Sequence, residues 1–149
     1  MVPYPKDTGW IEVICGPMIS GKTEELIRRL RRALYAKQPI EIYKPKIDTR
    51  YAEIEIVSHS RFRLFAKPIT QATDILQQLE AKTEVVGIDE AQFFDRQLVS
   101  VVQELADRGK RVIIAGLDQD YRGAPFEPMP ELMAIAEFVS KCLAICVVC

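Results

Sequence analysis

Residues 16–23 have the types and spacing of a loop that binds phosphate groups. Their sequence, GPMISGKT, fits the pattern G-x-x-x-x-G-K-[ST]. Glycines at both ends let the backbone bend around phosphates with its N–H groups pointing inward, at the positive end of a following helix. In this interpretation Lys22 reaches the β- and γ-phosphates, and the Thr23 hydroxyl binds Mg²⁺. A glycine-containing turn that matches by chance is the alternative.

An acidic pair further along the chain offers the other groups that such a loop needs. Asp89 follows the apolar run 85–88, and a carboxylate at the end of a hydrophobic strand is the usual partner of the loop hydroxyl on Mg²⁺. Glu90 comes next and, beside a γ-phosphate, could accept a proton from an attacking hydroxyl. A solvated strand end is the alternative for this pair, and the phosphate loop upstream favours the catalytic interpretation.

Alternating strand-like and helix-like segments must position these residues. Leu26, Ile27, Leu30 and Leu34 recur at helical spacing after the loop, and charged residues fill the opposite face. Strands are expected at 10–15, 40–43, 54–58, 85–88 and 112–115, and helices at 23–34, 72–79, 98–105 and 130–139, before a strand containing Cys142 and Cys146. This order predicts an α/β unit with right-handed crossovers and a mostly parallel sheet.

Composition limits the classes of protein and partner. The 149 residues are 48% hydrophobic and 28% charged, which is typical of one soluble globular domain. Lys plus Arg number 20 against 21 Asp plus Glu, and this net charge of −1 argues against nucleic acid as a partner. We expect a cytoplasmic protein without a membrane partner, because no stretch approaches the ~18–20 apolar residues that cross a bilayer.

Six motifs together resemble a known family. GPMISGKT, KPKIDTRY, SHS, IDEAQFF, GLDQDYRGAPF and CLAICVVC occur in the order and approximate spacing of the cytosolic type II thymidine kinases. The resemblance extends from about Trp10 to the C-terminus. It implies a RecA-like P-loop NTPase core at residues 1–139, with a mostly parallel sheet flanked by helices, and the start of a zinc-binding segment at 140–149. It also implies a homotetramer that transfers the γ-phosphate of ATP to the 5′-hydroxyl of thymidine with Mg²⁺.

The resemblance also assigns roles to individual positions. Glu90 matches the catalytic base and Asp89 the magnesium-side carboxylate. The implied ATP-binding residues are Gly16, Pro17, Met18, Ile19, Ser20, Gly21, Lys22, Thr23, Asp48, Thr49, Arg50, Asp89 and Gln92. Arg50 could neutralise charge on the transferred group, with a surface turn as the alternative. The implied thymidine-binding residues are Met18, Phe93, Leu117, Tyr121 and Phe126, although such side chains more often serve packing alone.

The chain departs from the family pattern at two places. Ile19 stands where the family has an aromatic residue, and we expect little effect on nucleotide binding. Cys146 and Cys149 have C-x₂-C spacing, but structural Zn²⁺ takes four ligands, so they would form half of a site. In the family a second cysteine pair follows a lasso-like loop that closes over thymidine, and we expect that segment to be missing from this sequence. A redox pair is the alternative for the two cysteines.

Two other functions remain open from the sequence. One is a different RecA-type P-loop phosphotransferase or ATPase, which would differ in its acceptor. The other is a nucleotide-binding interaction module that does no chemistry. His59, the only histidine, is more often a satisfied polar residue than a metal ligand.

Overall fold

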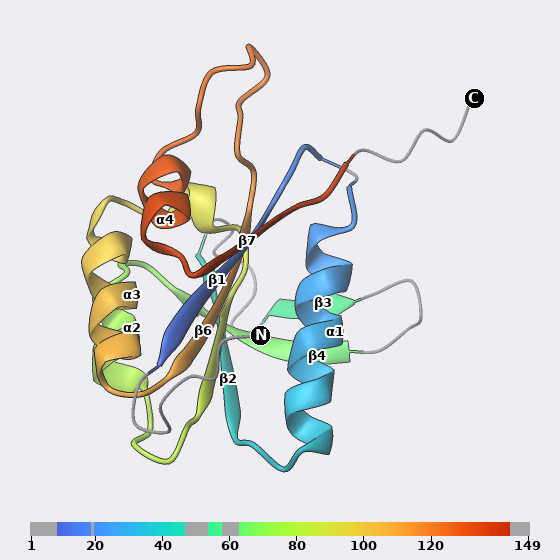
Figure 1. The fold of residues 1–149 in the computed structure, drawn as a ribbon. Helices are drawn as coiled ribbons and strands as arrows, with labels where there is room; N and C mark the ends of the chain where they lie inside the picture. Colours follow the sequence, from blue (N-terminus) through green and yellow to red (C-terminus); the bar gives the residue numbers. More distant parts are fainter. Residues whose placement is uncertain (1–8, 19, 47–53, 58–62, 144–149) are drawn as a thin grey trace.

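A parallel sheet forms the centre of the molecule (Figure 1). The computed structural model describes residues 9–18, 20–46, 54–57 and 63–143. Their strands are β1 (Trp10–Cys15), β2 (Ile40–Pro45), β3 (Ile54–Val57), β4 (Arg63–Ile69), β5 (Val85–Ile88), β6 (Arg111–Gly116) and β7 (Phe138–Lys141). They form a 7-stranded sheet in the order β3-β4-β2-β5-β6-β1-β7, parallel throughout except for the antiparallel pair β3 and β4. The expected mostly parallel sheet is confirmed.

Helices cover both faces of this sheet (Figure 1). They are α1 (Lys22–Tyr35), α2 (Asp74–Gln78), α3 (Gln97–Asp107) and α4 (Met129–Ile135), with a 3-10 turn η1 (Ala91–Phe93) after β5. Helix α1 packs on one face through Leu26, Ile27 and Leu30, while α2, α3 and α4 pack on the other. Among the described helices, none is long and apolar enough to cross a bilayer.

The central strands are buried on both faces, as the apolar runs predict. In β6, Val112 and Ile114 face the cluster under α3, whereas Ile113 and Ala115 face the cluster under α1. All four are fully buried. Burying a side chain of the size of Val or Ile contributes about 1.5–3 kcal/mol, so both layers hold the sheet rigid beneath its loops.

Two strands differ from the sequence expectation. Strand β4 lies in a segment with no strand signal, because its sequence RLFAKPI carries charges and Pro68. Strand β3 pairs only with residues 63–66 of β4, so Pro68 lies beyond the ladder between these two strands. The backbone N–H that proline lacks is therefore not needed for pairing with β3. The last helix begins near Pro130 as expected, but it ends at Ile135. The last two residues expected in that helix, Phe138 and Val139, instead begin β7.

β7 is a strand because it pairs with β1, Phe138 opposite Glu12 and Lys141 opposite Cys15. Its own sequence is mostly exposed, so periodicity does not reveal it. Cys142 follows β7 instead of lying within it, and Cys146 is outside the described residues. The expected boundary between residues 139 and 140 falls inside β7, and the division into two parts stays a prediction.

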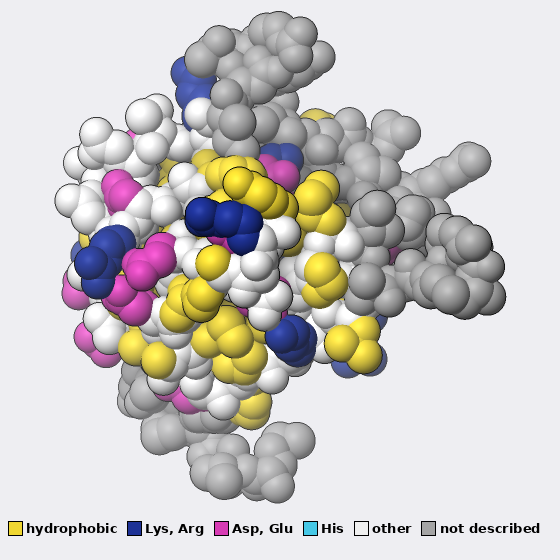
Figure 2. Space-filling model, turned by 90° about the horizontal axis from the view of Figure 1, so that it is seen from above, with side chains coloured by type: hydrophobic (Ala, Val, Ile, Leu, Met, Phe, Trp, Pro, Cys, Tyr) yellow, Lys and Arg dark blue, Asp and Glu magenta, His cyan; other side chains and the backbone are white. Residues whose placement is uncertain are grey.

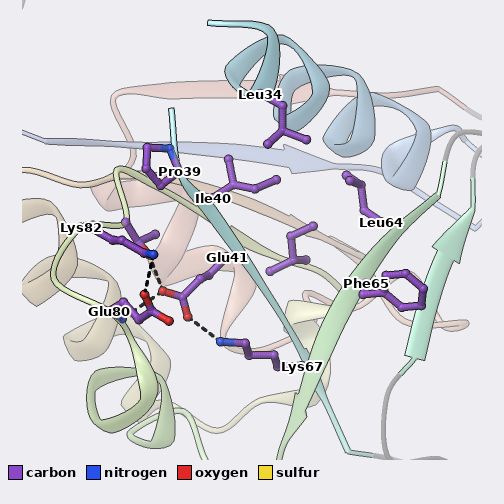
Figure 3. Close-up of a pocket in the computed structure, with 11 residues that line it drawn as sticks. Leu34, Pro39, Ile40, Glu41, Leu64, Phe65, Lys67, Glu80 and Lys82 are labelled. Atoms are coloured by element: carbon purple, nitrogen blue, oxygen red, sulfur yellow. Dashed lines mark hydrogen bonds and ion pairs between the residues drawn. The ribbon is translucent and has the colours of Figure 1, made fainter. Parts of the chain in front are cut away.

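A hollow of about 510 Å³ lies where β2 and β4 begin, under the end of α1 (Figure 3). Its wall is largely apolar, but the Glu41 carboxylate is buried in it and accepts four hydrogen bonds. The donors are Lys67 Nζ at 2.8 Å, the Glu80 backbone N–H at 2.9 Å, the Tyr43 hydroxyl at 2.7 Å and the Thr83 hydroxyl. Burial alone would raise the pKa of Glu41, but these donors outweigh it and hold the pKa at about 2.

Replacing Glu41 with Gln should therefore make stability less sensitive to acid. The ordinary pKa of Glu41 is 4.5, so its stabilising effect is complete above that pH and is lost as the pH falls towards about 2. Glu41→Gln should lower the free energy of unfolding by about 2 kcal/mol at pH 7, measured by urea denaturation. The gap to the wild-type protein should narrow between pH 4.5 and 2. Glu80→Gln, at an exposed side chain, is the control; a gap that is constant with pH would contradict this account of Glu41.

Candidate active site

The candidate residues gather at the edge of the sheet where the parallel strands end. This edge is at the top of Figure 1 and faces the viewer in Figure 2, where hydrophobic side chains spread over the centre of the face beside scattered charged ones. The phosphate loop follows β1, the acidic pair follows β5, and the segment with Leu117 and Tyr121 follows β6. Ligand sites of open α/β sheets form at this edge, because successive loops meet there.

Glycine is required at both ends of the phosphate loop. A Cβ atom on Gly16 would lie 2.3 Å from the carbonyl oxygen of Cys142, so the loop can pass the backbone that follows β7 only without a side chain. Gly21 has φ 82° and forms the left-handed turn from which α1 starts. The loop therefore delivers the first N–H groups of α1, a helix of 14 residues, to the carboxyl edge of the sheet.

Lys22 is the first residue of α1 and its side chain turns back over the loop. Its ammonium donates to the Pro17 carbonyl at 2.6 Å and to the Ser20 hydroxyl at 3.3 Å. Burial lowers the pKa of Lys22, and the nearby carboxylates Asp89 and Asp118 act against this effect. The cation is thus held within reach of anything that the loop binds, as the motif predicts.

The two residues expected to hold Mg²⁺ lie together. The Thr23 hydroxyl donates to Asp89 Oδ2 at 3.4 Å, and the Glu90 backbone N–H donates to Asp89 Oδ1 at 2.9 Å. Asp89 is 4% exposed, and burial raises its pKa. A hydroxyl and a carboxylate are the hard oxygen donors that Mg²⁺ prefers, and Mg²⁺ takes few protein ligands when phosphates and water supply the rest. The residues present therefore fit the ion.

Glu90 leaves the strand in an unusual backbone conformation. Its φ of 52° and ψ of 44° are left-handed, which is rare for a residue other than glycine. The turn separates the Glu90 side chain from that of Asp89, so one carboxylate is buried and its neighbour is 37% exposed. Strained backbone of this kind concentrates at functional sites, because surrounding structure must hold it in place.

A hollow of about 480 Å³ adjoins the phosphate loop. It is lined by Pro17, Met18, Leu117, Asp118, Gln119, Asp120, Tyr121, Phe126, Lys141 and Leu143. The set includes all the expected thymidine-binding residues except Phe93, whose ring packs edge-on against Phe126 with centroids 6.1 Å apart. The structure thus brings these side chains together beside the loop, as expected of one binding site.

Gln92 has a partner within the protein. Its buried amide oxygen accepts a hydrogen bond from the Leu117 N–H at 3.1 Å, which ties η1 to the end of β6. This contact holds η1 against Leu117, which lines the hollow. Direct contact of Gln92 with ATP stays a prediction.

Three further charged residues of this edge are not among the expected site residues. Lys141 forms an ion pair with Asp118 at 2.8 Å across one side of the hollow, and Lys44 lies 3.7 Å from Glu90. Asp118 shares the signal that revealed Asp89, because it also comes just after a buried strand. Lys44 similarly comes just after the apolar part of β2. Nothing in the sequence indicates which side chains Lys44, Asp118 and Lys141 contact.

Several expected site residues lie outside the described residues. They are Ile19, Asp48, Thr49, Arg50, Cys146 and Cys149, and their roles stay predictions. His59, which was not expected to be a ligand, also lies outside them. Within the described residues, no group of three or more His, Cys, Asp or Glu side chains could hold a metal ion by itself.

The sheet order, the phosphate loop and the acidic pair define a P-loop nucleotide-binding protein. A family model described as thymidine kinase matches residues 9–149. A thymidine kinase from Rhodothermus sp. (strain ITI 518) is 61% identical over 141 residues, covering 95% of this chain and 66% of that protein. One from Bdellovibrio bacteriovorus (strain ATCC 15356 / DSM 50701 / NCIMB 9529 / HD100) is 57% identical over 146 residues, covering 98% of this chain and 72% of that protein. The chain spans about two thirds of the length of these relatives.

The chain belongs to the thymidine kinase family. The resemblance expected from the motifs and the RecA-like α/β fold class are both confirmed.

Substituting Asp89 should change the dependence of turnover on Mg²⁺. A neutral amide is a weaker ligand for a hard cation, so Asp89→Asn should raise the Mg²⁺ concentration that gives half-maximal ATP turnover by about tenfold or more. Asp107→Asn, on the exposed end of α3, is the matched control. Magnesium titrations of steady-state activity in both variants would decide the matter. An unchanged Mg²⁺ requirement in Asp89→Asn would remove Asp89 from the metal site.

Proposed function

We propose that this protein is an ATP-dependent thymidine kinase, which transfers the γ-phosphate of ATP to the 5′-hydroxyl of thymidine. The observation that supports this most strongly is that the phosphate loop and the apolar hollow beside it meet at Met18. This residue belongs to the phosphate loop and also lines the apolar hollow between Leu117, Tyr121 and Phe126. A nucleoside base held in that hollow would place its sugar beside the loop, where the γ-phosphate of ATP would lie.

Residues of this chain can supply each role in the transfer. Residues 16–23 cradle the phosphates, and Lys22 carries the positive charge that meets their outer oxygens. Thr23 and Asp89 would hold Mg²⁺, and the ion would supply positive charge that stabilises the phosphates during transfer. Glu90 accepts the proton of the 5′-hydroxyl as that oxygen attacks. Asp48, Thr49 and Arg50 complete the phosphate contacts in this proposal.

The other features of the proposal rest on the family resemblance. Cys146 and Cys149 would provide half of a structural Zn²⁺ site, since two sulfur ligands leave a tetrahedral ion incomplete. The active protein would be a cytoplasmic homotetramer. The net charge of −1 supports thymidine and ATP as partners in place of nucleic acid.

Release of ADP that depends on thymidine and on Glu90 tests the proposal. The full-length protein should release ADP from MgATP only when thymidine is present. Glu90→Gln should lower kcat by about 10², the lower end of the range for a general base, because a loose transition state leaves the acceptor proton in place until late. KM values for ATP and thymidine should change little, because the amide keeps the shape of the carboxyl group.

Other outcomes would favour another function. Glu104→Gln, on the exposed face of α3, is the control and should keep the wild-type kcat. ADP release without thymidine would indicate an ATPase, and ATP binding without turnover would indicate an interaction module. If Glu90→Gln keeps more than about a tenth of kcat, Glu90 is not the base.

A further inference from the structure

Lys44 lies beside the acidic pair because of the pairing of β2 with β5. Tyr43 is opposite Ile88 in the parallel register, and the Asp89 N–H donates to the Tyr43 carbonyl at 3.0 Å. Lys44, the next residue of β2, therefore lies beside Asp89 and Glu90, which follow the end of β5. The Lys44 side chain is 16% exposed, and its Nζ lies 3.7 Å from Glu90 Oε2.

The location of this cation matters because two carboxylates are adjacent in sequence. The negative charges of Asp89 and Glu90 repel each other. Burial of Asp89 strengthens this repulsion by lowering the local dielectric constant. The charge of Lys44 acts on Asp89 as well as on Glu90. Among the described residues, Lys22 is a second cation close to Asp89, but its ammonium is bound to Pro17 and Ser20 of its own loop. Lys44 is thus placed to balance the pair.

Glu90 needs such a partner more than Asp89 does. Asp89 is fixed by the Thr23 hydroxyl and by a backbone N–H. For the Glu90 carboxylate, the contact that the described residues show is the one to Lys44, and its side chain is 37% exposed on a left-handed turn. A partly exposed carboxylate can occupy several rotamers, and one fixed cation selects among them.

We propose that Lys44 is a positioning residue for the transfer reaction, whose ammonium holds the Glu90 carboxylate in the orientation that accepts the acceptor's proton. The inference rests on the proposed function, in which Glu90 is the base. Lys44 touches neither substrate in this role and acts only through Glu90. Its effect should therefore appear in kcat, should depend on the presence of the Glu90 carboxylate, and should be restored by another cation of similar reach.

A double-mutant cycle in the full-length protein tests this role. Lys44→Met should lower kcat by about tenfold, with KM for ATP and for thymidine within about twofold of the wild-type values. Lys44→Arg should recover kcat to within about threefold, because a guanidinium also pairs with a carboxylate. Added to Glu90→Gln, Lys44→Met should lower kcat by less than about twofold further, since the group that it positions is already absent.

A matched control separates this ion pair from ion pairs in general. Lys82 also pairs with a glutamate, Glu80 at 3.3 Å, but lies in the loop before β5 at the opposite end of the strand. Lys82→Met should keep kcat and KM. Thermal unfolding of each variant checks that the fold is kept, and Lys44→Gln replaces Lys44→Met if the latter does not fold.

The outcomes distinguish failure of the inference from failure of the proposed function. If Glu90→Gln lowers kcat but Lys44→Met leaves it within about twofold, the positioning role is wrong and the role of Glu90 stands. An equal loss from Lys44→Met with and without the Glu90 carboxylate would mean that Lys44 acts on something else, such as Asp89 or the fold. If Glu90→Gln itself keeps kcat, the proposed base and the positioning role are both wrong.

Discussion

The site depends on the parallel pairing of β1 with β6, β6 with β5, and β5 with β2. These pairings place Cys15 opposite Gly116 and Ile88 opposite both Ile114 and Tyr43, so the strands end at one edge. The loops that follow then meet, although they come from distant parts of the sequence. Because side chains alternate between faces along a strand, a shift of β5 by one residue against its neighbours would turn Asp89 away from Thr23.

A buried carboxylate fixes α1, and with it the phosphate loop, to this sheet. Glu12 of β1 accepts hydrogen bonds from Arg29 of α1 at 2.9 Å and from Arg111 of β6. Arg29 also donates to Ser140 of β7 at 3.1 Å. Burial alone would raise the pKa of Glu12, but its arginine partners lower it, so the carboxylate stays ionised. An unpaired charge at this depth would be costly, and the network therefore specifies where α1 lies.

Local signals in the sequence predicted the parts of the site that are local in structure. The phosphate loop and α1 follow from one continuous motif, and Asp89 follows from an apolar run that ends in a carboxylate. Strand β4 was missed, and the last strand was expected at Cys142 and Cys146, beyond the observed β7. Both strands are defined by their pairing with β2 and β1, while their own residues are charged or exposed. Spacing likewise gives no indication that Lys44 meets Glu90 or that Lys141 meets Asp118, since those contacts exist only after the sheet has assembled.

A crystal structure of the full-length protein with thymidine and a non-hydrolysable ATP analogue tests the central claim most directly. The claim is that one edge of the sheet holds both substrates. The account predicts phosphates on the N–H groups of residues 16–23, the thymine ring between Met18 and Phe126, and the 5′-hydroxyl about 3 Å from Glu90. A nucleoside bound in the hollow beside Glu41, or a 5′-hydroxyl directed away from Glu90, would contradict it.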